Sequence, residues 1–162
     1  TAPASVRSVG EAVMAADRLL ETAKAQADAQ VSERNAREKT ELMRQLGMDE
    51  GESATKASRT MIRQLEEDQK RRSKRALTDA IDRALIDLLA IYRDVLMVQV
   101  GGDGELINTD LSDLVHEIAQ DSTPRQTLAR VDHIETARKR LVANGNPLLV
   151  LEDMAISLRP QA

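Results

Sequence analysis

The sequence predicts an all-α fold, in which a long helical hairpin is followed by a compact helical bundle. Strands favour aromatic and β-branched residues, yet the 162 residues include one Tyr and no Phe or Trp. Gly and Pro are few, and apolar residues recur every three or four positions along most of the chain, which is the period of a helix. We therefore expect a single all-α domain. Residues 1–76 should form an extended, charged hairpin, and residues 77–162 the compact bundle.

The composition also excludes several classes of protein. There is no Cys, so disulfides, thiolate nucleophiles and Cys-based metal sites are ruled out. No apolar run reaches the roughly 18 residues that span a membrane, and the first residues lack an apolar signal-peptide core. The net charge of −4 argues against a dedicated DNA-binding domain, which is usually basic. We expect a cytoplasmic protein without a membrane partner and, because no initiator Met is present, a piece of a longer chain.

The first predicted helix begins at a capping box. Ser8 and Glu11 have the required spacing of three residues, and from there to about Leu46 the chain contains no Pro or Gly. A narrow, Ala-rich apolar stripe follows this helix: Val13, Ala16, Leu19, Leu20, Ala23, Ala27 and Val31. Residues 32–41 are almost wholly polar and should face solvent.

A second long helix should follow the loop at residues 47–51, with Ser53 as its cap. Its middle carries three acid-before-base pairs four residues apart, which stabilise an exposed helix: Glu66–Lys70, Glu67–Arg71 and Asp68–Arg72. After Ala76 the apolar stripe broadens, as in the central helix of a bundle. The Gly-rich segment 101–104 should end this helix.

Three shorter helices are predicted after that segment. Asn108 or Asp110 should cap the first, which turns Leu111, Leu114, Val115 and Ile118 inward. A capping box at Thr123 and Gln126, with Pro124 at the first helical position, starts the second. The second should end at Gly145 and bury five apolar side chains: Leu128, Val131, Ile134, Leu141 and Val142. Asn146 and Pro147 open the last helix, which runs to about Leu158 and is apolar on most of its circumference.

No group of residues has a catalytic or metal-binding pattern. His116 and His133 lie on the polar faces of two different helices and lack HExxH spacing. The segment 101–104 lacks the phosphate-loop pattern, and a calcium loop starting at Asp103 would need Glu at position 114, which is Leu. We expect no catalytic residue, cofactor, metal site or small-molecule substrate, and no enzymatic activity in this chain.

The main charge feature is a cluster of five cations within six residues. We call it the basic run: Lys70, Arg71, Arg72, Lys74 and Arg75. Such a run can neutralise several phosphates. It has no aromatic neighbours for base stacking, and the acids at positions 66–68 offset part of its charge. Two interpretations stay open, namely a solvated, ion-paired helix and a contact with nucleic acid or an acidic partner.

Four segments together resemble a known family. They are "LTDAIDRALIDLLAIYRDVLMVQVG" at 77–101, "LIN" with "DL" at 106–111, "ARVDHIETARKRLVANGNP" at 129–147 and "LLVLEDMAISL" at 148–158. In this order they resemble the carboxy-terminal collar domain of the clamp-loader subunits of bacterial DNA polymerase III, in particular those of the delta-prime type. The resemblance covers residues 77–159. The preceding hairpin is longer and more charged than the usual opening of a collar.

The resemblance implies a role in assembly. In this family the collars of five subunits pack in a ring, and the complex loads a sliding clamp on DNA. An ATPase-type module precedes the collar, and because this chain has no Walker motif we expect that module to be absent from it. We expect the central helix and the last two helices to contact other clamp-loader subunits through Tyr92, Met97, Asn146, Pro147, Leu148, Leu151 and Met154. Two alternatives are the collar of the ATP-hydrolysing tau/gamma subunit and a DNA-binding helical module that uses the basic run.

Overall fold

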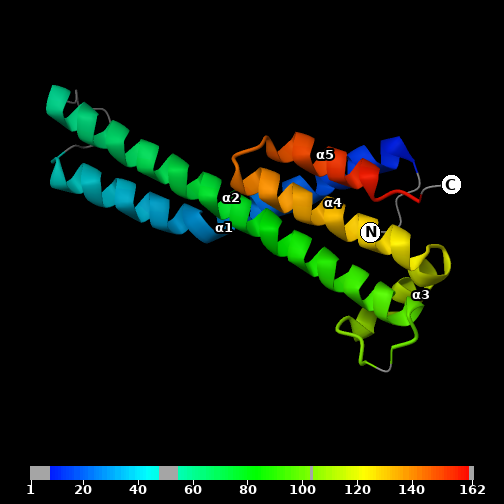
Figure 1. Ribbon diagram of the computed structural model, residues 1–162. Helices are drawn as coiled ribbons and strands as arrows, with labels where there is room; N and C mark the ends of the chain where they lie inside the picture. Colours follow the sequence, from blue (N-terminus) through cyan, green and yellow to red (C-terminus); the bar gives the residue numbers. More distant parts are fainter. Residues whose placement is uncertain (1–7, 48–54, 103, 161–162) are drawn as a thin grey trace. The chain divides into compact units, whose positions relative to one another are not determined.

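The computed structural model describes residues 8–47, 55–102 and 104–160. Its elements are α1 (Val9–Gln45), α2 (Lys56–Gln99), a short 3₁₀ helix η2 (Thr109–Leu111), α3 (Ser112–Gln120), α4 (Pro124–Val142) and α5 (Pro147–Ser157), shown in Figure 1. Across these described ranges there is no strand, which confirms the all-α prediction. No helix in them is long and apolar enough to cross a membrane.

The chain divides into two compact units. The hairpin unit comprises residues Ala23–Ala80, and the bundle unit comprises the residues up to Thr22 together with Ile81–Ala162. We expected the hairpin to include everything up to residue 76, but the start of α1 groups with the bundle instead. This start carries the buried side chains Ala12, Ala15, Ala16 and Leu20.

The helix starts follow the predicted capping chemistry. The Ser8 hydroxyl accepts from the Glu11 N–H at 3.1 Å, and the Glu11 carboxylate accepts from the Ser8 N–H at 3.0 Å. Thr123 and Gln126 form the second predicted capping box, with Pro124 at the first position of α4. Helix α2 begins after Thr55, whose hydroxyl accepts from the Ser58 N–H at 3.1 Å. The expected cap Ser53 and most of the loop at 47–51 lie outside the described residues.

The connection between α4 and α5 depends on a close approach of the backbone. Asn144 adopts the left-handed conformation with φ of 69°, and the Gly145 N–H donates to the Arg140 carbonyl at 2.8 Å. A Cβ at position 145 would lie 2.9 Å from that carbonyl oxygen, so the position requires glycine for space. The Asn146 side chain then accepts from the Leu149 N–H at 3.2 Å and caps α5, as predicted.

Each α-helix of the bundle unit contributes buried side chains to its core. Its fully buried large side chains include Ile81, Leu85, Tyr92, Val95, Val115, Ile134 and Leu151. The part of α2 in the bundle unit runs antiparallel to α4, because its first turn meets late α4: the Arg138 Nε lies 2.7 Å from the Asp82 carboxylate. At the other end the Thr127 hydroxyl donates to the Gln99 side chain at 2.8 Å. Helix α5 packs along α4 (Figure 1).

The buried face of α4 agrees with the predicted one at Ile134 and Leu141 and differs elsewhere. It consists of Thr127, Arg130, Ile134, Ala137 and Leu141, which are spaced three and four residues apart. The expected core residues Leu128 and Val142 are instead 51% and 80% exposed. Two polar residues, Thr127 and Arg130, occupy this face because each has a partner on α2. Apolar periodicity alone therefore assigned only part of the face correctly.

The hairpin unit contains little buried apolar surface. Its main cluster is made of Ala27, Val31 and Ala76, with Leu77 packed against it. Polar contacts join the two helices further along: the Gln69 amide donates to the Asn35 carbonyl at 2.8 Å. This is consistent with the predicted narrow, Ala-rich stripe, since small side chains allow close approach but bury little area.

Candidate functional site

A buried carboxylate connects two of the segments that the sequence singles out. The Asp94 side chain is 0% exposed and accepts from the backbone N–H groups of Ile107 at 3.0 Å and Asn108 at 2.8 Å. The Asn108 side-chain amide and the Arg93 guanidinium also donate to it, at 2.9 and 2.8 Å. Asn108 is one of the two expected caps, with Asp110, but its amide binds Asp94 and makes no cap hydrogen bond. The N-cap position of α3 is Leu111, which has no side-chain cap hydrogen bond.

The surroundings of Asp94 favour its charged form. Burial raises the pKa of this carboxyl, but the donors from Asn108, Ile107 and Arg93 outweigh that effect and lower the pKa to about 2. Arg93 also donates to the Glu105 carbonyl at 3.1 Å. The result is a cross-link that fixes the segment before η2 on α2. We call this group of residues (Arg93, Asp94, Ile107 and Asn108) the Asp94 cluster.

Gln99 forms a second cross-link at the end of α2. Its side-chain amide donates to the carbonyl and hydroxyl oxygens of Ser122, at 2.8 and 3.1 Å. Its side-chain oxygen accepts from the buried Thr127. The Gln99 side chain therefore holds the α3–α4 connection and the first turn of α4 in place. Sequence reasoning missed Gln99 and Thr127 because neither belongs to an apolar or charged pattern.

Three of the seven predicted interface residues belong to the core. Tyr92 and Leu151 are 0% exposed, and Met154 is 3% exposed. The Arg130 guanidinium lies 6.0 Å from the centre of the Tyr92 ring, at the outer range of a cation–π contact, and burial raises the Tyr92 pKa. This corrects our expectation, because side chains enclosed by their own unit offer no surface to another subunit.

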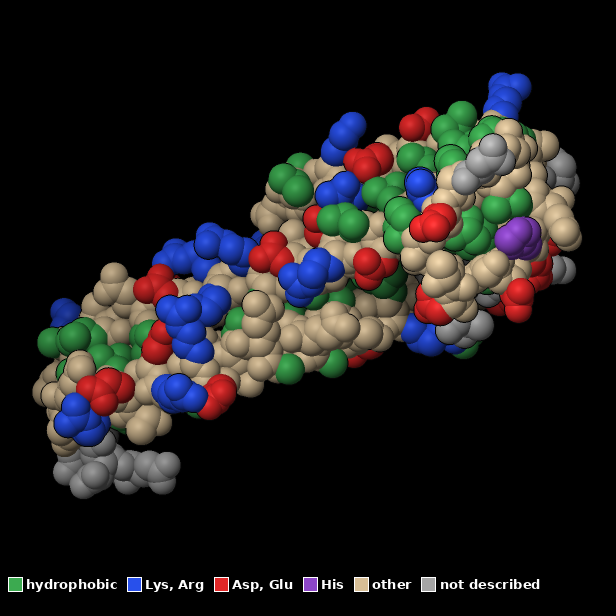
Figure 2. All heavy atoms as spheres, turned by 90° about the horizontal axis from the view of Figure 1, so that it is seen from below, with side chains coloured by type: hydrophobic (Ala, Val, Ile, Leu, Met, Phe, Trp, Pro, Cys, Tyr) green, Lys and Arg blue, Asp and Glu red, His purple; other side chains and the backbone are tan. Residues whose placement is uncertain are grey.

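The other predicted residues reach the surface, and most of them lie near the α4–α5 connection. Asn146 is exposed, and Pro147 and Leu148 are partly exposed, as is Met97, which packs against the turn at Gly102. Two apolar residues join them there, Val142 at 80% and Leu149 at 62% exposed. We call Val142, Asn146, Pro147, Leu148 and Leu149 the α4–α5 patch. Figure 2 shows apolar side chains reaching the surface of the bundle unit among charged ones.

The basic run divides into structural and free members. Arg72 is half-buried and bridges to α1, where it donates to the Asn35 and Glu38 side chains at 2.8 Å each. Its hydrogen bond, with that of Arg34, lowers the Glu38 pKa to about 2. Arg71 pairs with Asp68. Lys70, Lys74 and Arg75 are exposed and have no ion pair with any described residue.

The ion pairs of the middle of α2 join other partners than the three acid-before-base pairs expected from the sequence. Arg63 pairs with Glu67 at 3.4 Å, and Glu66 lies 3.9 Å from Lys39 of α1. Glu38, rather than Asp68, takes Arg72. An oppositely charged residue on the other helix of the hairpin competes with the one four residues away on the same helix. The sequence of a single helix does not show this competition.

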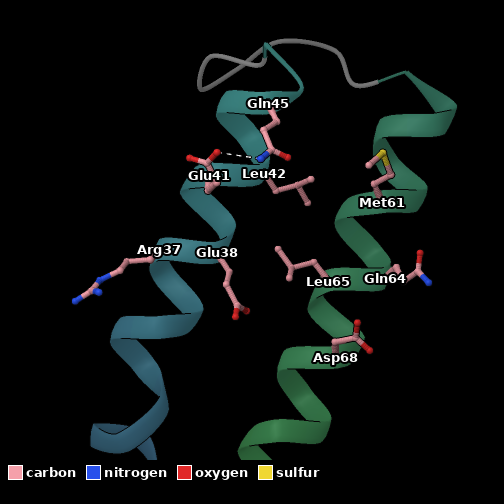
Figure 3. A pocket seen from close by; sticks show the side chains of 9 residues that line it. All are labelled: Arg37, Glu38, Glu41, Leu42, Gln45, Met61, Gln64, Leu65 and Asp68. Carbon is pink, nitrogen blue, oxygen red and sulfur yellow. Dashed lines mark hydrogen bonds between the residues drawn. The ribbon is translucent and has the colours of Figure 1, made fainter.

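A groove of about 530 Å³ lies between the two helices of the hairpin unit. Figure 3 shows Leu42 and Leu65 pointing into the gap between the helices, while Arg37 points away. Met61, which also lines the groove, is 48% exposed, and Glu38, Glu41 and Asp68 supply carboxylates. The groove contains neither histidine nor any hydroxyl nucleophile among its lining residues.

The histidines lie where the sequence predicts. His116 and His133 are both exposed, on α3 and α4, and the His116 Nδ1 lies 2.7 Å from the Ser112 carbonyl oxygen. Over the described ranges no three His, Asp or Glu side chains gather in a way that could hold a metal ion.

One comparison with known proteins gives a partial match. Over 72 residues the chain is 35% identical to DNA polymerase III subunit delta' of Bacillus subtilis, which covers 44% of this chain and 22% of that relative's length. No family model matches the chain. No solved structure matches it significantly. The chain therefore contains a region related to part of a DNA polymerase III subunit.

Proposed function

We propose that this chain is the assembly, or collar, domain of a delta-prime-type clamp-loader subunit of DNA polymerase III. The observation that carries the proposal is the partial match to the delta' subunit of Bacillus subtilis. In this proposal the chain has a structural role, and catalysis belongs to other parts of the complex. The name of that relative favours delta-prime over the tau/gamma subunit.

The Asp94 cluster supports this proposal physically. The resemblance to clamp-loader collars rests partly on the "RD" stretch at 93–94 and the "LIN" stretch at 106–108. These two stretches are far apart in sequence, yet the Asp94 carboxylate accepts both backbone N–H groups of Ile107 and Asn108. The two stretches therefore form one hydrogen-bonded group that fixes the path of the chain after α2.

We assign the contact with neighbouring subunits to the α4–α5 patch. Val142 and Leu149 are large, apolar and exposed, although the unit buries Leu141 and Val150 directly beside them in sequence. Apolar side chains at the centre of an interface favour association once a partner removes them from water. The two residues stand on either side of a connection that Asn146 and Gly145 hold in one conformation, so the patch is preorganised for binding.

The test is a double substitution, Val142→Asp with Leu149→Asp, in a subunit co-expressed with the other clamp-loader subunits of its organism. Both side chains are exposed, so we expect the helix content and thermal midpoint to stay near those of the unmodified protein. Each carboxylate would have to be desolvated at the interface, so we expect the recovered complex to fall at least about tenfold, since a cost of about 1.4 kcal/mol already corresponds to this factor.

Leu128→Asp provides a matched control. It places the same charge on an exposed leucine of α4, about 21 Å along the helix from Val142. We expect the Leu128 variant to assemble normally. Recovery of an intact complex from the double variant would overturn the assignment of the patch, and failure of the unmodified chain to associate with any clamp-loader subunit would overturn the proposed function itself.

A further inference from the structure

The two units differ in net charge. The hairpin unit contains thirteen Lys and Arg and eleven Asp and Glu, whereas the rest of the chain contains ten and sixteen. Within the hairpin unit the excess lies on α2, where residues 56–76 carry eight cations and three acids. The overall charge of −4 therefore conceals a locally basic helix.

Four of these cations share the outer face of α2. Arg59, Arg63, Lys70 and Lys74 follow spacings that keep them on one side of a helix, and all four are exposed. The inner face is defined by Gln69 and Arg72, which bond to α1, and by the buried Ala76. We call these four residues the basic stripe. It extends about 22 Å along the helix axis.

Acidic neighbours offset only part of the charge of the basic stripe. Glu66 and Glu67 flank it on α2, where Glu67 pairs with Arg63 at 3.4 Å and Glu66 lies 3.9 Å from Lys39 of α1. Within the described part of the chain, Arg59, Lys70 and Lys74 make no ion pair. Lys70 and Lys74 line a shallow hollow of about 240 Å³ with Glu67 and Arg71. In contrast, the cations of α1 at positions 34, 37, 39 and 44 all have an acidic partner.

We propose that the basic stripe is a binding surface for double-stranded DNA, which it contacts through the phosphate backbone without reading sequence. A duplex strand presents one phosphate per about 3.4 Å of axis, so about six phosphates span the length of the stripe. The stripe consists of long, flexible side chains on a helix exterior, and such side chains can reach successive phosphates. This surface is separate from the α4–α5 patch and does not depend on the proposed function.

The side chains present select duplex over single-stranded DNA. Proteins that hold single strands stack the bases on aromatic rings, and the lone aromatic residue of this chain, Tyr92, is buried in the bundle unit. Electrostatic attraction to the phosphates is the interaction that remains, and a duplex has the higher density of phosphates.

The experiment measures anisotropy of a fluorescein-labelled duplex of about 24 base pairs during titration with the 162-residue chain, at salt from about 50 to 200 mM. If four phosphates are neutralised, the affinity should fall about 100-fold over that range, since the logarithmic slope is about −0.9 per phosphate. We expect the same strand in single-stranded form to bind more weakly.

Two fourfold variants with equal change in charge locate the surface. The first variant should weaken duplex binding at least tenfold and flatten its salt dependence; it combines Arg59→Gln, Arg63→Gln, Lys70→Gln and Lys74→Gln. The control variant removes the paired cations of α1 and should change binding less than threefold; it combines Arg34→Gln, Arg37→Gln, Lys39→Gln and Arg44→Gln. Circular dichroism checks that both variants remain helical. Equal losses in the two variants, tighter binding of the single strand, or no duplex binding at the lowest salt would each overturn the proposal.

Discussion

The hairpin unit and the bundle unit share two helices, but they are stabilised differently. In the bundle unit large apolar side chains such as Leu85, Ile134 and Leu151 are fully buried, and the buried polar groups Asp94 and Thr127 are hydrogen-bonded. In the hairpin unit the buried apolar residues are small: apart from Val31 they are the alanines at positions 23, 27, 76 and 80. Its remaining interactions are ion pairs and hydrogen bonds near the surface.

The bundle unit therefore depends more than the hairpin unit on the burial of apolar side chains for its stability. Burial of a large aliphatic side chain stabilises a fold by about 1.5–3 kcal/mol, while an exposed ion pair contributes about 0–1 kcal/mol. Damage to a single buried residue should therefore affect the bundle unit far more than the hairpin unit. A helical hairpin with little buried surface opens locally at low cost.

The largest effect is expected from Leu151→Asp. A carboxylate buried without a partner costs several kcal/mol, so we expect this variant to lose the cooperative unfolding of the bundle unit. Val31→Asp is the matched change in the hairpin unit. Its neighbours are mainly alanines, so the new carboxylate can reach water and should cost much less. Thermal unfolding followed by circular dichroism and intrinsic Tyr92 fluorescence measures both. Equal destabilisation by the two variants would contradict the contrast between the units.

An intermediate effect is expected from Asp94→Asn. The substitution places an amide opposite backbone donors, and loss of charged hydrogen bonds in a buried site costs about 3 kcal/mol near pH 7. The folded-state pKa of about 2 lies below the ordinary value of 3.8, so the stabilisation from this carboxylate is present above pH 4 and is lost as the pH falls toward 2. About 2 kcal/mol of the difference between variant and unmodified protein should disappear over that window.

Urea unfolding at a series of pH values measures this difference. Asp87→Asn, an exposed carboxylate on the same helix, is the control and should show little change at any pH. A deficit for Asp94→Asn that stays constant from pH 7 to pH 2 would falsify the assigned role of the charged form. Because the cluster lies in the bundle unit, hydrogen exchange in the hairpin should be unaffected by either variant.

The smallest effect is expected from Arg72→Gln in the hairpin unit. Arg72 joins α2 to Asn35 and Glu38 of α1, but its site is partly exposed to water and the loss should remain local. We expect amide hydrogen exchange near residues 35 and 69 to rise a few-fold, while the main thermal transition stays in place. Lys74→Gln, which removes an exposed cation from the same helix, should leave exchange unchanged. A shift of the main transition would show that the hairpin and bundle units unfold together.

Several elements were predictable from sequence because their causes are local. Ser8, Thr123 and Asn146 cap their helices as predicted, since each cap bonds a backbone N–H within three residues. The exposed positions of His116 and His133 followed from helical periodicity. The all-α class followed from composition, which reflects the preferences of many residues at once and therefore tolerates errors at single positions.

The same reasoning could not separate buried apolar residues from exposed ones. Apolar periodicity identifies a face that avoids water, but it does not separate burial within the chain from burial by a partner. Tyr92, Leu151 and Met154 belong to the first kind, while Val142 and Leu149 are left exposed. The face of α4 was misassigned for a related reason, because Thr127 and Arg130 look like surface residues until Gln99 and Tyr92 are placed beside them.

The sequence by itself determined the helices, their caps and the separation into a charged, Ala-rich part and an apolar part, because short-range hydrogen bonding and composition control these features. The tertiary structure alone decided which polar side chains are buried, which cations are neutralised and which apolar residues remain at the surface. Those outcomes depend on contacts between residues far apart in the chain, such as Asp94 with Asn108 and Arg72 with Glu38. Such pairs become visible only when the helices are packed, since each partner by itself has an ordinary surface pattern.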